Sequence, residues 1–185
     1  SDVMDEGPLM FTGNNLDVAV NGKGWLAVQL PDGSEAYTRA GSLEVEVTGL
    51  LQTKSGYPMV GDGGPISVPP DNRVEIAPDG TVSVIPKFGT PNNASAIGRI
   101  KLVNPPEATL VRGSDGLFRV NNGQPAARDD GVKLTSGTLE GSNVNVTDAM
   151  VNLISLSRQF EMQIKLLQTA DTNAQRADQL LSLNA

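Results

Sequence analysis

The residue types that most often carry chemistry in proteins are missing from this sequence. Its 185 residues include neither histidine nor cysteine. The commonest general base, the commonest metal ligand, any disulfide and any thiolate site are therefore excluded. Carboxylates, lysine, serine and tyrosine are the groups left for catalysis. We accordingly expect no enzymatic activity, no bound metal, no cofactor and no small-molecule substrate.

Two kinds of glycine-containing motif could be mistaken for ligand sites. Residues 60–65 (VGDGGP) have the glycine content of a phosphate-binding loop but lack its Lys-Ser/Thr pair and its following helix. The Asp-Gly pairs at Asp32, Asp79 and Asp115 lack the dense acidic spacing of a calcium loop. Turn formation explains these pairs, because Asp accepts hydrogen bonds from nearby backbone and Gly adopts positive φ.

Paired carboxylates for glycan hydrolysis are defined by their separation in space and not in sequence. A secreted carboxylate-based glycan hydrolase therefore stays open as an alternative, although few aromatic residues are present to stack on sugars.

Charge and hydropathy narrow the possible partners further. The formal net charge is −7, and the 14 basic residues are dispersed along the chain, so no nucleic-acid partner is expected. No apolar run is long enough to cross a bilayer, and residues 1–6 do not resemble a secretory signal. We therefore expect no direct membrane insertion. Because the first residue is not Met, the natural beginning of the protein is expected to lie upstream.

The elements that must position any site are mostly strands. Twenty glycines and twelve prolines, concentrated before residue 142, separate short alternating apolar runs, which is typical of strands and tight turns. Hairpins are expected at Asn21-Gly22, Thr48-Gly49, 78–80 (PDG) and 114–116 (SDG). We predict a mainly β fold over residues 1–140, an irregular antiparallel barrel or sandwich with no long helix between residues 15 and 138. Loops are expected at residues 88–95 and 121–130.

The last stretch predicts one long helix. Residues 147–183 contain no Pro or Gly, and Thr147 with Asp148 supplies an N-cap and a first-turn carboxylate. At 1.5 Å per residue this helix would run roughly 55 Å, longer than the domain needs to cover its own core.

Every seventh residue from Val146 is apolar, which favours a helical partner. We predict that residues 141–185 form a coiled-coil-like assembly segment, although the helix could instead fold back on its own domain. The predicted assembly interface consists of Val146, Met150, Leu153, Leu156, Phe160, Ile164, Leu167, Ala174 and Leu181.

Several segments, taken in order, closely resemble motifs of one protein family. They are 12–20 (TGNNLDVAV), 24–29 (GWLAVQ), 36–42 (AYTRAGS), 49–53 (GLLQT), 79–83 (DGTVS) and 136–145 (SGTLEGSNVN). Arg158, Phe160, Glu161, Gln163 and Lys165 then resemble the helix that follows in that family. On these motifs the chain resembles the rod and hook proteins of the bacterial flagellum over nearly its whole length.

The resemblance implies a structural subunit of the flagellar basal-body rod, the periplasmic drive shaft for motility. Residues 24–26, 98–103 and 115–119 are most similar to members from the proximal rod. The resemblance also implies export through the flagellar type III apparatus, terminal helices packed as a coaxial tube, and β domains as an outer layer. The implied partners are other rod and hook proteins and copies of the chain itself.

The family also has an N-terminal helical segment before its β region, and nothing here corresponds to it. A phage tail or adhesin-like subunit is the nearest alternative within the structural class.

Overall fold

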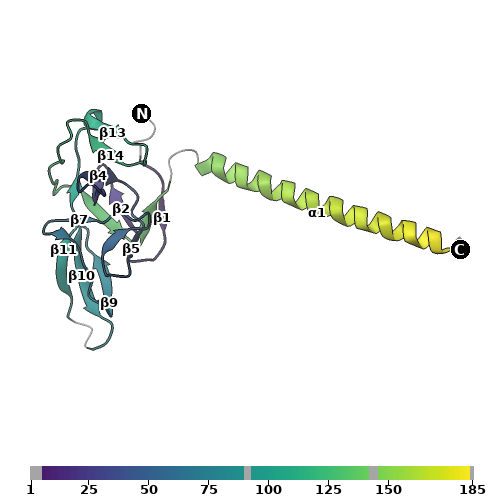
Figure 1. The fold of residues 1–185 in the computed structure, drawn as a ribbon, viewed down its shortest axis with the longest axis horizontal. Helices are drawn as coiled ribbons and strands as arrows, with labels where there is room; N and C mark the ends of the chain where they lie inside the picture. Colours follow the sequence, from purple (N-terminus) through teal and green to yellow (C-terminus); the bar gives the residue numbers. More distant parts are fainter. Residues whose placement is uncertain (1–5, 90–92, 142–145, 184–185) are drawn as a thin grey trace. The chain divides into compact units, whose positions relative to one another are not determined.

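The computed structural model describes residues 6–89, 93–141 and 146–183, and within the long helix it describes the side chains of residues 158–181. The chain divides into two compact units, Ser1–Asn143 and Val144–Ala185, called the β unit and the helical unit below (Figure 1).

The β unit consists of short strands joined by turns. These are β1 (Leu9–Phe11), β2 (Val18–Asn21), β3 (Trp25–Gln29), β4 (Glu35–Thr38), β5 (Leu43–Val45), β6 (Leu51–Thr53), β7 (Val60–Gly61), β8 (Gly64–Pro65), β9 (Asn72–Ile76), β10 (Thr81–Pro86), β11 (Ser95–Arg99), β12 (Leu102–Val103), β13 (Leu110–Arg112), β14 (Phe118–Val120), β15 (Lys133–Ser136) and β16 (Thr138–Glu140). A single 3-10 turn, η1 (Glu107–Thr109), interrupts them in the described part of this unit.

All strand pairs between named strands are antiparallel. A five-stranded sheet has the order β12-β3-β4-β14-β13, a three-stranded sheet has the order β11-β10-β9, and β1-β16, β2-β15, β5-β6 and β7-β8 form two-stranded ribbons. The predicted antiparallel β fold is confirmed, and its sheets are sandwich-like; no closed barrel forms among the described residues.

The core lies on both faces of the five-stranded sheet. Leu26 and Val28 of β3 point into the larger apolar cluster, while Trp25 and Ala27 point into a smaller one with Tyr37. Side chains alternate along a strand, so this distribution shows that β3 is covered on both sides. In the smaller cluster the ring centroids of Trp25 and Phe118 lie 4.6 Å apart, with the rings tilted by 47°, and this separation is within the range of interacting aromatic pairs.

Most predicted hairpins are present, but one prediction was wrong. Turns at 48–49, 78–80 and 114–116 join β5 to β6, β9 to β10 and β13 to β14. The expected hairpin at Asn21-Gly22 does not form, because β2 pairs with β15 whereas β3 pairs with β4 and β12. Gly24 diverts the chain here: its φ is +136°, and a Cβ on it would lie 2.6 Å from Val132 Cγ1.

The two expected loops have different outcomes. Residues 121–130 contain no named strand, only an isolated bridge between Val103 and Arg128. Of the expected loop 88–95, residues 90–92 lie outside the described part, and β11 already begins at Ser95.

The helical unit is one continuous helix, α1 (Val146–Leu183), of 38 residues. It begins one residue before the predicted start and ends where predicted. At 1.5 Å per residue it is about 57 Å long. Within the described chain, no helix is apolar enough to span a bilayer.

Candidate assembly surface

The apolar side chains described on α1 are not buried. Phe160, Ile164, Leu167 and Leu181 are exposed, and so is Ala174. A single helix cannot fold over its own surface, so this face needs a partner to become buried. The other predicted interface residues, Val146, Met150, Leu153 and Leu156, lie in the part of α1 whose side chains are not described. The role of the whole set in assembly stays a prediction.

The apolar surface is wider than the predicted seam. Met162, Leu166 and Leu180 are also exposed, and none of them belongs to the predicted set. At 100° per residue, the apolar arc from Met162 to Ile164 covers about 200° of the helix circumference. An ordinary surface helix has an apolar face only somewhat wider than about 100°. The breadth of this apolar arc suits a helix packed among several neighbours.

A buried ion pair anchors the strand that leads toward α1. Arg39 Nε donates to Glu140 Oε2 over 2.8 Å, and Arg39 Nη2 donates to Glu140 Oε1 over 2.8 Å. These side chains are only 12% and 10% exposed. Arg39 Nη1 also donates to the carbonyl of Gly24 over 2.8 Å. We call this bidentate pair the Arg39–Glu140 clamp; charge-assisted bonds of this kind are strong and geometrically specific.

The clamp also forms a hydrogen bond with the segment that leads into β1. Gly7 N donates to Glu140 Oε1 over 3.2 Å, and β1 follows directly and pairs with β16. Leu9, Met10 and Phe11 of β1 are all exposed, Phe11 by 88%. The β1–β16 ribbon therefore carries exposed apolar side chains. Sequence analysis did not single out Arg39 or Glu140, although both lie in segments that carry the family resemblance.

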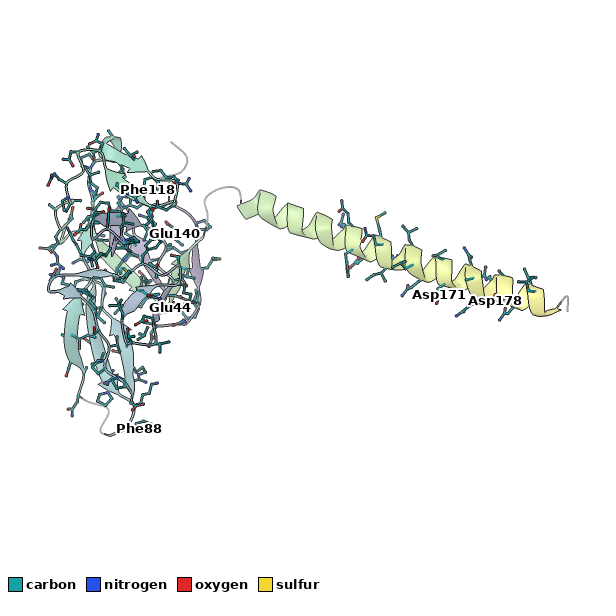
Figure 2. All side chains as sticks on the ribbon, viewed as in Figure 1. Glu44, Phe88, Phe118, Glu140, Asp171 and Asp178 are labelled. Carbon is teal, nitrogen blue, oxygen red and sulfur yellow. The ribbon has the colours of Figure 1, made fainter. Side chains whose placement is uncertain are left out.

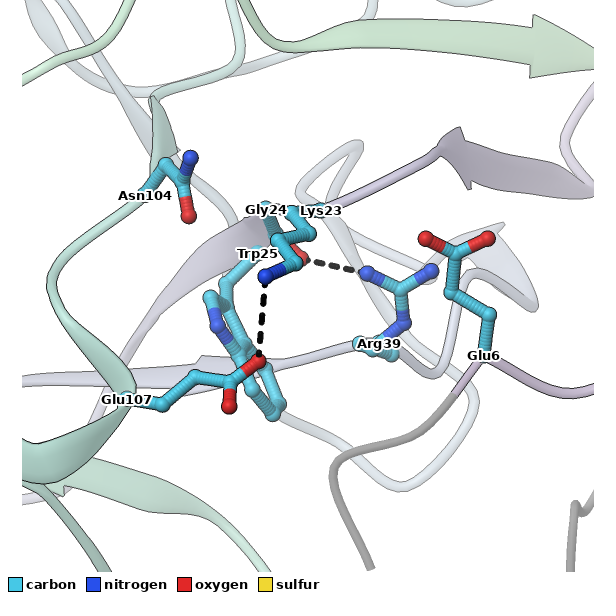
Figure 3. A pocket seen from close by; sticks show the side chains of 7 residues that line it. All are labelled: Glu6, Lys23, Gly24, Trp25, Arg39, Asn104 and Glu107. Carbon is cyan, nitrogen blue, oxygen red and sulfur yellow. Dashed lines mark hydrogen bonds and ion pairs between the residues drawn. The ribbon is translucent and has the colours of Figure 1, made fainter.

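A hollow lies beside the clamp, and most charged side chains that line it are paired. It encloses about 270 Å³ and is lined by Glu6, Lys23, Gly24, Trp25, Arg39, Asn104 and Glu107 (Figure 3). Arg39 is committed to Glu140 and Gly24, and Lys23 Nζ lies 4.0 Å from Glu107 Oε1. Arg39, Lys23 and Glu107 in the lining of this hollow thus already have partners.

A larger hollow of about 600 Å³ lies beside the 32–35 turn and β14. Its Arg119 pairs with Asp115 over 2.7 Å, and the hydrogen bonds from Arg119 lower the pKa of Asp115 to about 2. Among the described residues, no group of three or more acidic side chains could hold a metal ion.

The Asp-Gly pairs act in turns. Asp79 Oδ1 accepts from the backbone N–H of Thr81 over 2.9 Å, and Asp115 Oδ1 accepts from that of Leu117 over 3.1 Å. Asp32 Oδ1 accepts from the N–H of Ser34 over 2.9 Å. These bonds are of the Asx-turn type that the sequence predicts.

Comparison with known proteins matches both units. Residues 19–84 match the family model described as the flagellar hook protein FlgE/F/G D1 domain. Residues 135–180 match the model described as flagellar basal body rod FlgEFG protein C-terminal. The second match begins in β15 and extends into α1, so it includes Glu140 and most of the exposed apolar arc.

Individual relatives agree with the family models. The flagellar basal-body rod protein FlgF of Escherichia coli K12 is 44% identical over 98% of this chain and 74% of its own length. FlgF of Salmonella typhimurium is 43% identical over the same shares. The flagellar basal-body rod protein FlgG of Bacillus subtilis is 35% identical over 86% of this chain and 63% of its own length. The predicted resemblance to flagellar rod proteins is confirmed.

Proposed function

This chain belongs to the family of flagellar basal-body rod proteins, and on that premise we propose that it joins the rod through the apolar arc of its helical unit. As a member it is a structural subunit of the flagellar basal body. We place residues 141–185 as the assembly segment and residues 1–140 as the β domain around it, in the proximal part of the rod. The proposed interface is Val146, Met150, Leu153, Leu156, Phe160, Ile164, Leu167, Ala174 and Leu181, extended by Met162, Leu166 and Leu180.

The exposed arc on α1 is the observation that carries this proposal. Burying a Leu, Ile, Phe or Met side chain stabilises by about 1.5–3 kcal/mol, and Phe160, Ile164, Leu167 and Leu181 are all uncovered. Exposed apolar surface on this scale marks an interaction site. The partners are other rod and hook proteins and further copies of this chain. The function is mechanical, and we propose no catalytic activity.

A charge placed on the apolar arc tests the proposal. Phe160→Asp is expected to abolish motility in cells whose only copy of the protein carries it, because an unpaired carboxylate cannot be buried between packed helices. Thr172→Asp adds the same charge in the middle of the polar side of α1, about 120° from Phe160, and should leave motility intact. Neither change should shift the melting temperature of the β unit, since both lie outside it. Motile cells carrying Phe160→Asp would refute the assembly role of the arc.

A further inference from the structure

The basic side chains of α1 and two of its acidic ones form separate stripes, and Glu161 lies beside the basic stripe, about 60° from Arg158. The basic residues of the helix are Arg158, Lys165 and Arg176, and at 100° per residue they fall within about 20° of one another around the axis. Asp171 and Asp178 form an acidic stripe about 140° away, and Figure 2 shows both on the same side of α1. All five side chains of the two stripes are exposed. The ion pairs found between described residues involve none of them.

The basic stripe lies just outside one edge of the apolar arc, and the acidic stripe lies inside the arc near the other edge. On the 100°-per-residue wheel, the basic stripe borders the arc on the side of Met162 and Leu180. The acidic stripe lies near the other end of the arc, between Leu167 and Ile164. A helix that packs through the arc therefore presents basic side chains beside one edge of its apolar face to one neighbour, and acidic side chains near the other edge to the next. Complementary charges at the edges of an apolar face set partner choice and register between packed helices.

The spacing of the charges selects one register. Arg158 and Lys165 are seven residues apart, as are Asp171 and Asp178, and each acid lies thirteen residues after its basic counterpart. We propose that neighbouring copies of the helical unit pack in parallel with an axial displacement of thirteen residues, so that Arg158 and Lys165 of one copy face Asp171 and Asp178 of the next. At 1.5 Å per residue the displacement is about 20 Å.

This inference rests on the proposed function and adds a partner and a register to it. The contact joins unlike edges of the arc, so it is heterologous and repeats from copy to copy in one direction, as a rod requires. An antiparallel pair would place Arg158 opposite Asp178 and Lys165 opposite Asp171. Such a pair is isologous, closes on itself and cannot extend a rod.

Charge reversal in the complete protein, expressed in cells that lack the native copy, tests the pairing. Arg158→Glu with Lys165→Glu, and separately Asp171→Lys with Asp178→Lys, should each shrink the swimming halo at least about twofold, because like charges would then face each other at every contact. All four changes together restore the opposition of unlike charges and should recover the halo. Unchanged halos for both double variants, or no recovery in the quadruple variant, would refute the register.

The design separates this inference from the proposed function. If Phe160→Asp abolishes motility while the charge reversals are tolerated, the register is wrong and assembly through the arc stands. If Phe160→Asp is itself tolerated, the proposed function fails.

Cross-linking distinguishes the parallel register from the antiparallel one. The chain contains no cysteine, so introduced thiols are the sole targets of a short bismaleimide in this protein. In purified basal bodies, Arg158→Cys with Asp171→Cys should yield covalent multimers, whereas Arg158→Cys with Asp178→Cys should not. Within one helix positions 158 and 171 are about 20 Å apart, so the reagent cannot join them inside one copy. Multimers from the second pair alone, or from neither, would overturn the proposal.

Discussion

Tyr37 is a single residue that ties a loop to the sheet of the β unit. It is 1% exposed, and its hydroxyl accepts from the backbone N–H of Ala126 over 2.6 Å and donates to Glu35 Oε2 over 3.0 Å. Lys101 Nζ donates to both oxygens of Glu35 over 3.0 and 2.9 Å. Burial, with repulsion from Glu35 adding to it, raises the pKa of Tyr37 to about 12.

The raised pKa of Tyr37 predicts a loss of stability at alkaline pH. The pKa of the phenol is higher in the folded than in the unfolded chain. The contribution of Tyr37 to the free energy of unfolding is therefore fully present below pH about 10 and is lost as the pH rises toward about 12. Tyr37→Phe should lower the free energy of unfolding by about 1–3 kcal/mol at neutral pH, because the N–H of Ala126 loses its partner.

Urea titrations across the alkaline range compare the wild type with Tyr37→Phe. The gap in stability between them should narrow as the pH rises from about 10 to about 12. If the difference in free energy of unfolding between the two proteins stays constant over this range, the fold does not hold the phenol neutral.

Glu140 is the residue on which the clamp depends. Glu140→Gln keeps the shape of the side chain but leaves the guanidinium of Arg39 buried without a counter-charge. Breaking a buried pair in this way costs about 3–5 kcal/mol, and chemical denaturation of the β unit measures it.

Glu107→Gln is the matched control for Glu140→Gln. Its pair with Lys23 is 55% and 74% exposed, so its removal should cost less than about 1 kcal/mol. Equal costs for the two changes would contradict the structural role given to the clamp.

At the scale of elements, sequence predicts the pairings that turns make and misses those that distant strands make. The hairpin β9–β10 is predictable from residues 78–80 (PDG), because the turn sets the register of the two strands that it joins. The ribbon β2–β15 joins Val20 to Leu134, and nothing local encodes that contact. The wrong prediction of a hairpin at Asn21-Gly22 has the same cause. The turn residues favour a hairpin, but the long-range packing of Gly24 against Val132 directs β2 and β3 to other partners.

The candidate assembly surface was predictable to a similar extent. A seven-residue count finds Phe160 and Leu167 because it follows a single column of the helix. It passes over Leu166 and Leu180, which a count around the full circumference includes. The clamp could not be found from sequence, because Arg39 and Glu140 are 101 positions apart and either alone has the appearance of a surface charge.

The close crossing of β2 and the segment after β4 depends on one glycine. Val18 N donates to Gly41 O over 2.9 Å, and a Cβ on Gly41 would lie 1.7 Å from the carbonyl oxygen of Val18. We expect Gly41→Ala to destabilise the β unit by about 3 kcal/mol or more, because a backbone atom cannot move aside cheaply.

Gly63→Ala serves as the control for Gly41→Ala. A Cβ on Gly63 would meet nothing within 4 Å, so the change should stay within about 0.5 kcal/mol. Thermal denaturation of both variants decides the matter, and a wild-type melting temperature for Gly41→Ala would show that the crossing is not tight.

At the scale of the whole molecule, the two units should differ in stability when the chain is alone. The β unit has a continuous core, whereas the described apolar side chains of α1 are exposed. Helices gain most of their stability from packing, and regions with few buried apolar contacts open at low cost.

Hydrogen exchange read by mass spectrometry tests this difference. Amides of residues 146–183 should exchange within seconds in the monomer, while those of β3 and β4 stay protected. Assembly into basal bodies should protect the helix. Slow exchange of α1 in a dilute monomer would contradict the view that its partner lies outside the chain.

The β1–β16 ribbon also determines how the β unit bears mechanical load. The chain enters at Gly7 and leaves at Gly141 side by side, with Gly141 N donating to the carbonyl of Pro8 over 2.7 Å. Tension that separates these two points peels the ribbon open one hydrogen bond at a time, the weakest geometry for a strand pair, instead of shearing all its bonds at once. The Arg39–Glu140 clamp lies at the end where peeling must start, so it resists the first step of peeling. Single-molecule pulling between residues 7 and 141 should show one rupture peak that Glu140→Gln lowers, and an unaltered peak would show that the clamp carries no load.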